Sequence, residues 1–160
     1  MNIEWNKRTV LELIICIAIP VLVGCISSAL TRNAQIAFVR VAKPPLAPPG
    51  WLFPVVWTVL YIAMGLASFL IFESDAYYSR TAICVYVVQL IFNFFWSLIF
   101  FRAGTYTFAA IWLGILWVMV VALIVMSIKI SGIAFFLLLP YGLWCTFALY
   151  LNIGIAVLNK

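Results

Sequence analysis

The chain has 160 residues, of which 68% are hydrophobic, and its nine basic and four acidic side chains give a formal net charge of +5. A soluble domain has about a quarter charged residues, against only 8% here, so we predict an integral membrane protein. No basic cluster could follow a phosphate backbone, so nucleic acid is not expected as a partner. The sequence contains no histidine, which removes the commonest metal ligand and haem axial ligand.

Five continuously apolar segments follow one another along the chain. A helix of about 20 residues crosses the hydrocarbon core, and none of the segments has the period-2 alternation of an outer-membrane barrel. The sequence therefore predicts an all-α protein with one domain, residues 1–160, built as a bundle of five transmembrane helices. The predicted helices span about 9–31, 51–72, 81–101, 106–128 and 133–158. The connector 32–50 is long and contains the pairs Pro44-Pro45 and Pro48-Pro49; the others are short, so neighbouring helices should be antiparallel.

The first segment also resembles a secretory signal. Lys7 and Arg8 precede an apolar run, and the residues up to Cys25 resemble a lipoprotein cleavage box. However, the apolar sequence continues beyond Cys25 to Leu30, and Glu12 interrupts the basic start. We therefore predict a retained first helix.

The distribution of basic residues gives only a weak preference for orientation. With five spans, one side carries four basic residues and the other carries five: Lys7, Arg8, Arg80 and Lys129 against Arg32, Arg40, Lys43, Arg102 and Lys160. The positive-inside rule then predicts an N-terminus outside and a cytoplasmic C-terminus.

No predicted span has a charged residue away from its ends. Buried charges usually mark proton relays and ion pathways, so a proton-driven exporter, an ion channel and conventional acid–base catalysis are not expected. The four cysteines have no CxxC spacing and are interpreted as packing residues, so no metal site is expected.

Three spans instead carry stripes of aromatic and amide side chains at helical spacing. The stripes are Trp57, Tyr61 and Met64; Gln89, Asn93, Trp96 and Ser97; and Pro140, Trp144, Ala148 and Asn152. Facing inward, they would line a cavity suited to a flat conjugated ligand such as a porphyrin. The alternative is that the amides only connect helices. The small-residue spacings Gly24-xxx-Ser28 and Ala110-xxx-Gly114 allow close helix contact within the bundle or in a dimer.

These residues resemble the translocator protein family, also called the peripheral benzodiazepine receptor or tryptophan-rich sensory protein (TspO/MBR) family. The resemblance covers the whole chain in order. The matching motifs are Lys43-Pro44-Pro45-Leu46-Ala47-Pro48-Pro49-Gly50-Trp51 with Trp57 and Tyr61, then Gln89-x-x-x-Asn93-x-x-Trp96-Ser97, then Leu139-Pro140-Tyr141-x-x-Trp144 with Phe147-Ala148 and Asn152.

The resemblance implies a five-helix membrane protein, usually a homodimer, that binds porphyrins such as protoporphyrin IX and haem. Its pocket positions correspond to Trp57, Tyr61, Asn93, Trp96, Trp144, Phe147 and Ala148, to which the third-helix stripe adds Gln89. No cofactor is required, because the porphyrin is the ligand. In some bacterial members, tryptophans that match Trp57 and Trp144 are implicated in light-dependent porphyrin degradation, so these two would be the catalytic residues if degradation occurs.

Two departures from the family pattern bear on the ligand. Many members have tryptophan where this chain has Leu46 between the proline pairs. The sterol motif of animal members needs a spacer before its tyrosine and a nearby basic residue, whereas Tyr150 directly follows Leu149 and the next basic residue is Lys160. We therefore expect a bacterial member that acts as a porphyrin receptor or sensor in the cell membrane. A light-dependent porphyrin-degrading enzyme and a sterol or lipid carrier are the alternatives.

Overall fold

The computed structural model describes residues 5–37 and 41–159, and for residues 34–37 only the backbone. These residues form five long helices and one π-helical turn: α1 (Lys7–Ala37), α2 (Leu52–Phe72), α3 (Ser79–Ser97), η2 (Leu98–Arg102), α4 (Tyr106–Ile128) and α5 (Gly132–Leu158). Five helices in the described ranges are long and apolar enough to cross a membrane. The predicted all-α bundle of five transmembrane helices is thus confirmed.

Polar side chains at the helix ends explain where two of the helices begin. The Asn6 side chain accepts hydrogen bonds from the backbone N–H groups of Arg8 (2.9 Å) and Thr9 (3.0 Å), before the first turn of α1. Ser131 accepts from the N–H of Ala134 (3.3 Å) at the start of α5. Both side chains satisfy N–H groups that have no partner inside the helix.

The first helix ends later than the loss of hydrophobicity predicts. Helix α1 continues to Ala37 instead of ending near 31, and the Thr31 hydroxyl donates to the Ser27 carbonyl (2.9 Å) as the helix leaves its apolar part. The third span ends close to its predicted position, since α3 ends at Ser97 and the helical path continues as η2 as far as Arg102. Hydrophobicity marks the edge of the hydrocarbon layer, whereas backbone hydrogen bonds can continue into the headgroup region. Of the basic residues used for orientation, Arg40 and Lys160 lie outside the described residues.

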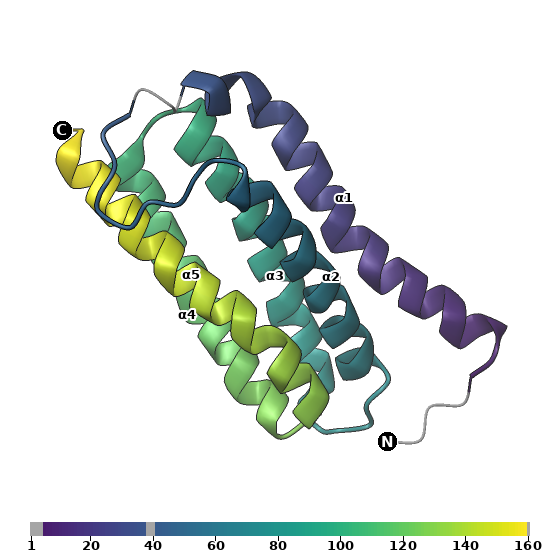
Figure 1. Cartoon of the computed structure of the whole chain (residues 1–160). Helices are drawn as coiled ribbons and strands as arrows, with labels where there is room; N and C mark the ends of the chain where they lie inside the picture. The colour runs from purple at the N-terminus through teal and green to yellow at the C-terminus, as the bar shows by residue number, and fades with distance from the viewer. Residues whose placement is uncertain (1–4, 38–40, 160) are drawn as a thin grey trace.

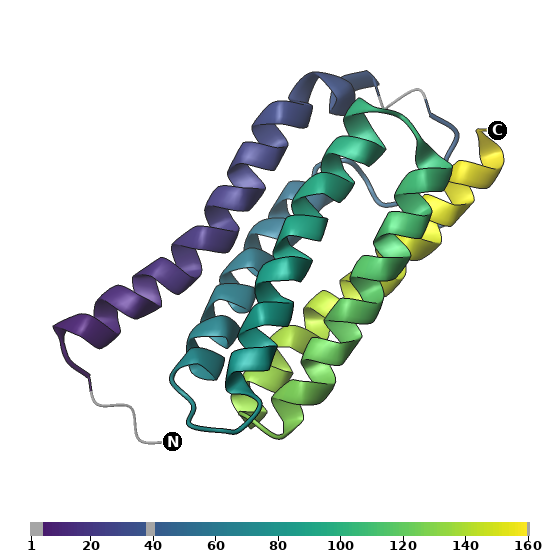
Figure 2. The same cartoon turned by 180° about the vertical axis from the view of Figure 1, so that it is seen from behind.

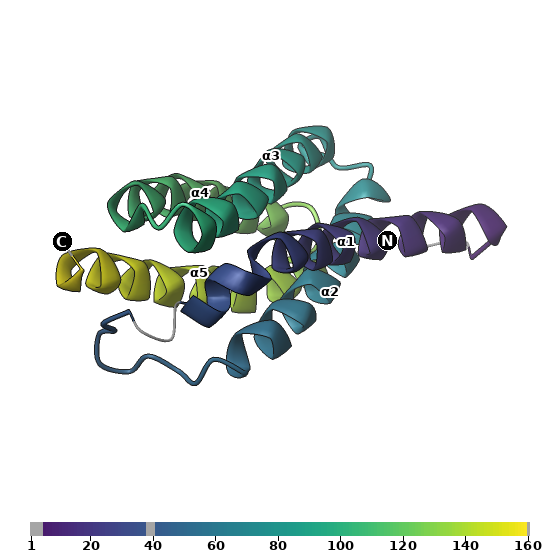
Figure 3. The same cartoon turned by 90° about the horizontal axis from the view of Figure 1, so that it is seen from above.

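The helices run up and down through a two-layered bundle (Figures 1 and 2). Seen along the bundle, α3 and α4 form one layer and α2 and α5 the other, while α1 packs against α2 and α3 (Figure 3). The segment 41–51 has no helix and crosses one end of the bundle from α5 to the start of α2 (Figure 1).

Glycine allows α1 and α2 to approach at backbone distance. A Cβ atom placed on Gly65 of α2 would lie 2.6 Å from the Cα of Ile17 on α1. Such contact between small residues is how membrane helices gain packing energy, because lipid removes the hydrophobic drive for association.

The buried and exposed apolar side chains are separated as a lipid-embedded bundle requires. Met64, Leu116 and Leu138 have no exposed surface and lie in the central core. By contrast, Ile111 and Phe136 are 61% and 70% exposed on the outer faces of α4 and α5. Apolar outer faces of this extent suit a hydrocarbon solvent.

Candidate functional site

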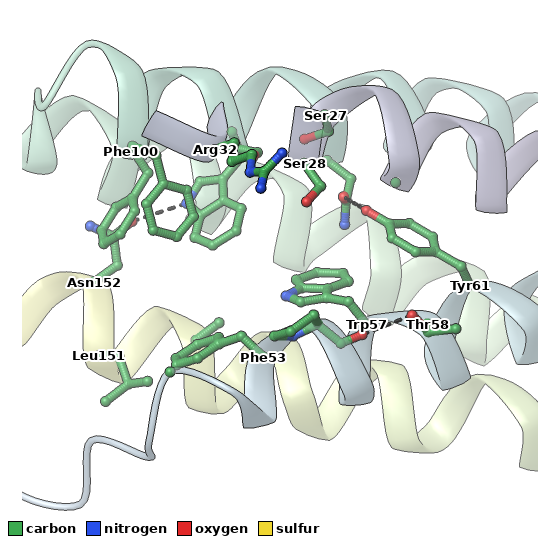
Figure 4. A pocket seen from close by; sticks show the side chains of 18 of the residues that line it. Ser27, Ser28, Arg32, Phe53, Trp57, Thr58, Tyr61, Phe100, Leu151 and Asn152 are labelled. Carbon is green, nitrogen blue, oxygen red and sulfur yellow. Dashed lines mark hydrogen bonds between the residues drawn. The ribbon is translucent and has the colours of Figure 1, made fainter. Parts of the chain in front are cut away.

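A cavity of about 740 Å³ lies at the end of the bundle that the segment 41–51 crosses. Its walls come from α1, α2, α3, η2, α5 and that segment, so it is enclosed by almost every element of the fold (Figure 4). The volume falls within the range of about 300–1,000 Å³ that is typical of pockets for small molecules.

Aromatic rings form one continuous side of this cavity. The Trp57 ring stacks on Tyr61 with centroids 5.4 Å apart, and it lies 6.2 Å from the ring of Trp96. Trp96 in turn stacks on Phe100 at 5.4 Å and 25°. All four residues line the cavity, which therefore offers stacked π-surfaces to a planar ligand.

The turn η2 brings two phenylalanines into this wall. The Ala103 N–H donates to the Leu98 carbonyl (3.0 Å), a bond between residues five apart that widens the helix. Phe100 and Phe101 in this wide turn both line the cavity. Single π-helical turns of this kind are frequent at functional sites.

Hydrogen-bonded polar groups lie among the aromatic rings. The Tyr61 hydroxyl donates to Asn93 Oδ1 (2.7 Å), and both residues line the cavity. Trp96 Nε1 donates to Asn152 Oδ1 (3.1 Å), and Asn152 Nδ2 donates to the Tyr106 carbonyl (3.0 Å). These bonds connect α2 to α3, and α3 through α5 to α4, so the polar groups that face the cavity also hold its walls together.

Gln89 lies one turn deeper than Asn93 and does not line the cavity. It is fully buried, and its Oε1 accepts from the Tyr141 hydroxyl (2.7 Å), which itself accepts from Asn93 Nδ2 (3.1 Å). A chain of hydrogen bonds thus runs from Tyr61 at the cavity to Gln89 behind it. Gln89 Nε2 is buried without a partner among the described residues.

Trp144 and Phe147 lie beside the cavity and not among the residues that line it. The Trp144 ring packs edge-on against Phe53 (5.8 Å, 69°), and Phe53 is a lining residue. Phe147 contacts Trp144 (5.7 Å) and stacks on Tyr150 (6.2 Å). The structure therefore brings Trp57, Tyr61, Asn93, Trp96 and Ala148 together around the cavity and places Gln89, Trp144 and Phe147 outside its lining. The predicted role of each of these residues in ligand binding stays a prediction.

The contribution of α1 was not predicted from the sequence. Gly24, Ser27, Ser28 and Arg32 line the side of the cavity opposite the α2 aromatics (Figure 4 labels the last three). The Gly24-xxx-Ser28 spacing was an available signal, but it indicated only close helix contact.

The segment 41–51 is held against α5 by backbone and side-chain contacts. The Asn159 side chain accepts from the Ala42 N–H (3.1 Å) and donates to the Ala42 carbonyl (2.8 Å). The Tyr150 hydroxyl donates to the Pro45 carbonyl (2.9 Å). Leu46 has φ +68° and is 80% exposed, so it points away from the cavity that its neighbour Ala47 lines.

Comparison with known proteins agrees with this architecture. The sequence model of the TspO/MBR family matches residues 16–158. The chain is 33% identical over 157 residues to the Tryptophan-rich protein TspO of Chlorobaculum tepidum, covering 96% of this chain and 99% of the relative. It is 33% identical to the Tryptophan-rich sensory protein of Cereibacter sphaeroides, with 73% of each chain covered. It is 34% identical to the Translocator protein of Ovis aries, covering 72% of this chain and 70% of the relative. The chain therefore belongs to the TspO/MBR family of membrane proteins.

Proposed function

We propose that this protein is a membrane receptor or sensor that binds porphyrins, such as protoporphyrin IX and haem, in the cavity between its helices. The observation that carries the proposal is the wall of Trp57, Trp96 and Phe100 around about 740 Å³ of space, with Tyr61 and Asn93 as polar groups beside it. A flat conjugated molecule would stack on the rings and accept or donate a few hydrogen bonds. The porphyrin is the ligand, and no other cofactor is needed.

The test fills the cavity without changing charge. Ala148 lines the cavity and is 6% exposed, so Ala148→Phe would place a ring inside the binding volume. Ala122 is exposed on the outer face of α4, so Ala122→Phe adds the same ring toward lipid and serves as the matched control. Protoporphyrin IX is titrated into each protein in detergent, and the shift of its main absorption band is followed to saturation.

We expect wild type and Ala122→Phe to bind one porphyrin per cavity, and Ala148→Phe to bind about tenfold more weakly or worse, a loss of about 1.4 kcal/mol. The thermal unfolding midpoint of each variant shows whether the bundle is intact. Equal affinity in all three proteins, with Ala148→Phe still folded, would reject the cavity as the porphyrin site.

A second function, light-dependent porphyrin degradation, is favoured by the position of one indole. Trp57 lines the cavity, whereas Trp144 does not line it and packs against the lining residue Phe53. An indole in contact with an excited porphyrin is a plausible electron donor, with dissolved dioxygen as the oxidant, so the reactivity would belong chiefly to the ligand. Illuminated complexes of wild type, Trp57→Phe and Trp144→Phe are compared by absorbance and mass spectrometry. A product that wild type forms and Trp57→Phe does not would support the activity, whereas the same products from free porphyrin in detergent would exclude it.

The assembly and its orientation are further parts of the proposal. We propose a homodimer in a bacterial cell membrane, with the N-terminus outside and the C-terminus cytoplasmic. A Cβ atom on Gly114 would meet nothing within 4 Å, so this face of α4 is open to a second copy. Gly114→Leu should lower the dimer fraction in sedimentation experiments, and labelling of single cysteines from either side of the membrane reports the orientation. Unchanged sedimentation would remove this face as the contact.

A further inference from the structure

The Trp96 indole lies at the centre of the aromatic side of the cavity. Its ring is 6.2 Å from that of Trp57 on α2, stacks on Phe100 of η2 at 5.4 Å, and meets Phe101 edge-on at 6.3 Å. All four residues line the cavity. The plane of the Trp96 ring therefore determines how the rings of α2 and η2 are arranged around the binding space.

The N–H group of this indole bonds to a side chain from α5. Trp96 Nε1 donates to Asn152 Oδ1 (3.1 Å), and Asn152 is only 1% exposed. The other end of the same amide, Nδ2, donates to the backbone carbonyl of Tyr106 (3.0 Å) at the start of α4. Because an indole N–H can only donate and a carbonyl oxygen can only accept, one orientation of the amide satisfies both partners. Asn152 is therefore itself held in place by α4.

This hydrogen bond is the one that the Trp96 side chain can donate, because an indole has a single N–H group. Trp96 is 6% exposed, and a buried donor without an acceptor costs free energy that the ring can recover by turning toward another acceptor. Such a rotation would change the stacking on Phe100. Asn152 also lies one turn after Ala148 on the same face of α5, and both line the cavity (Figure 4 labels Asn152).

We propose that Asn152 is a positioning residue of the ligand site, whose amide fixes the plane of the Trp96 indole before a ligand arrives. The inference rests on the proposed porphyrin binding and adds a residue that acts through Trp96. A flat ligand then meets the rings of Trp96 and Phe100 already stacked, so binding does not pay for ordering them. Asn152 does not need to bond to the ligand, since each end of its amide has a partner within the bundle.

The experiment removes the hydrogen bond from each of its two sides. Asn152→Leu keeps the approximate size of the side chain and removes its acceptor and donor, whereas Trp96→Phe keeps an aromatic ring and removes the N–H group. The two substitutions are also combined, which separates the interaction between the residues from their individual effects. The matched control is Thr146→Val, which removes the acceptor of another hydrogen bond between α5 and an indole, that of Trp117 Nε1 (2.8 Å). Neither Thr146 nor Trp117 lines the cavity.

Two quantities are measured for each protein in detergent. One is the dissociation constant of protoporphyrin IX. The other is the indole N–H resonance of Trp96 in the ligand-free protein, recorded by NMR after labelling tryptophan with ¹⁵N and assigned by its absence from Trp96→Phe. A variant that alters only the stability of the bundle would not move this resonance selectively.

We expect Asn152→Leu to move the Trp96 resonance upfield, as an N–H without an acceptor does, and to weaken porphyrin binding about three- to tenfold, the range for one hydrogen bond between membrane helices. In the Trp96→Phe background, Asn152→Leu should change the affinity by less than about twofold. Thr146→Val should move the Trp117 resonance and leave the affinity unchanged. Asn152→Ser, whose hydroxyl can bond to its own helix, is expected to act like Asn152→Leu and replaces it if that variant does not fold.

The outcomes separate this inference from the proposal on which it rests. If Asn152→Leu weakens binding equally with and without the Trp96 indole, Asn152 does not act through Trp96, and the inference is wrong while porphyrin binding stands. An unmoved Trp96 resonance in Asn152→Leu would overturn it without any ligand. If wild type binds no porphyrin, the proposed function fails and the inference fails with it.

Discussion

The hydrogen-bonded chain from Tyr61 to Gln89 contains two tyrosines that make different numbers of hydrogen bonds. The Tyr141 hydroxyl accepts from Asn93 Nδ2 (3.1 Å) and donates to Gln89 Oε1 (2.7 Å). The Tyr61 hydroxyl donates to Asn93 Oδ1 (2.7 Å). Replacing tyrosine with phenylalanine removes the hydroxyl oxygen and keeps the ring. Tyr141→Phe therefore breaks two hydrogen bonds and Tyr61→Phe breaks one, with little change in packing.

The expected loss of stability follows from the groups left without a partner. Tyr141→Phe leaves Asn93 Nδ2 and both ends of the Gln89 amide unpaired, because Gln89 Nε2 already has no partner among the described residues. Hydrogen bonds between membrane helices contribute about 0.6–2 kcal/mol each, so Tyr141→Phe should lower the free energy of unfolding by about 1–4 kcal/mol. Tyr61→Phe should cost about half as much, because Asn93 Oδ1 borders the cavity, where water or ligand can donate to it.

The assay is reversible unfolding of the detergent-solubilised protein by a denaturing detergent, with porphyrin affinity measured in parallel. Tyr77→Phe is the matched control, since Tyr77 is 90% exposed, and it should change stability by less than about 0.5 kcal/mol. We expect Tyr61→Phe to weaken porphyrin binding and Tyr141→Phe to leave it nearly unchanged, because Tyr141 lies behind the cavity. Equal destabilisation by Tyr61→Phe and Tyr141→Phe would refute the argument that stability falls with the number of polar groups left unpaired. Loss of porphyrin binding only in Tyr141→Phe would refute the assignment of Tyr61 to the ligand side and Tyr141 to the region behind the cavity.

Three further substitutions test other contacts. Gly24→Ala would place a Cβ atom 2.3 Å from Cε2 of Tyr61, so the ring must shift. We expect a lower unfolding midpoint and weaker porphyrin binding. An unchanged midpoint would count against tight packing between Gly24 and Tyr61. Gly154→Ala would place a Cβ atom 2.6 Å from Cγ of Pro44 and displace the segment 41–51. Porphyrin release, measured by stopped flow, should therefore become faster. An unaltered release rate would show that the segment 41–51 does not control ligand release. Partial burial, with neighbouring carboxylates, raises the pKa of Glu73 above its ordinary value. The folded protein therefore loses stability as the pH rises through the window between the unfolded pKa of about 4.3 and the raised folded pKa. Glu73→Gln should abolish this fall in thermal scans, and an identical pH dependence in both proteins would contradict the assignment.

Helical periodicity was sufficient to predict which faces of α2 and α3 turn inward. Trp57 and Tyr61 are four residues apart, as are Gln89 and Asn93, so each pair occupies one face of its helix. In the structure, Trp57, Tyr61 and Asn93 line the cavity. The hydrophobic spans were also predictable, because the hydrocarbon thickness sets a minimum length that a composition search can recognise.

Depth along the helix axis could not be predicted in the same way. Gln89 shares a face with Asn93, but it lies one helical turn further from the cavity mouth. There its side chain bonds to Tyr141, and neither residue lines the cavity. Trp144 lies on the predicted stripe of α5, yet it packs edge-on against Phe53 of α2 and does not line the cavity. Where a cavity ends depends on side chains from neighbouring helices, and no single helix carries that information.

The role of α1 was hidden for a different reason. Apart from Arg32, its contribution to the cavity comes mostly from small residues such as Gly24, Ser27 and Ser28, which a search for aromatic or charged side chains does not select. Gly24 lets α1 pack directly on the Tyr61 ring, and Ser27 and Ser28 add short side chains to the same wall of the cavity.

The polar chain through the bundle thus has two parts with different physical consequences. Behind the cavity, Tyr141 and Gln89 hydrogen-bond between α5 and α3, in a region with no room for solvent, and their bonds contribute to stability. At the cavity, Tyr61 and Asn93 have the same chemistry but remain within reach of a ligand. Asn93 bonds to Tyr61 through Oδ1 and to Tyr141 through Nδ2, so one amide connects the two parts of the chain. Asn93 therefore joins α2, α3 and α5 through hydrogen bonds at the boundary between the cavity and the solid core behind it.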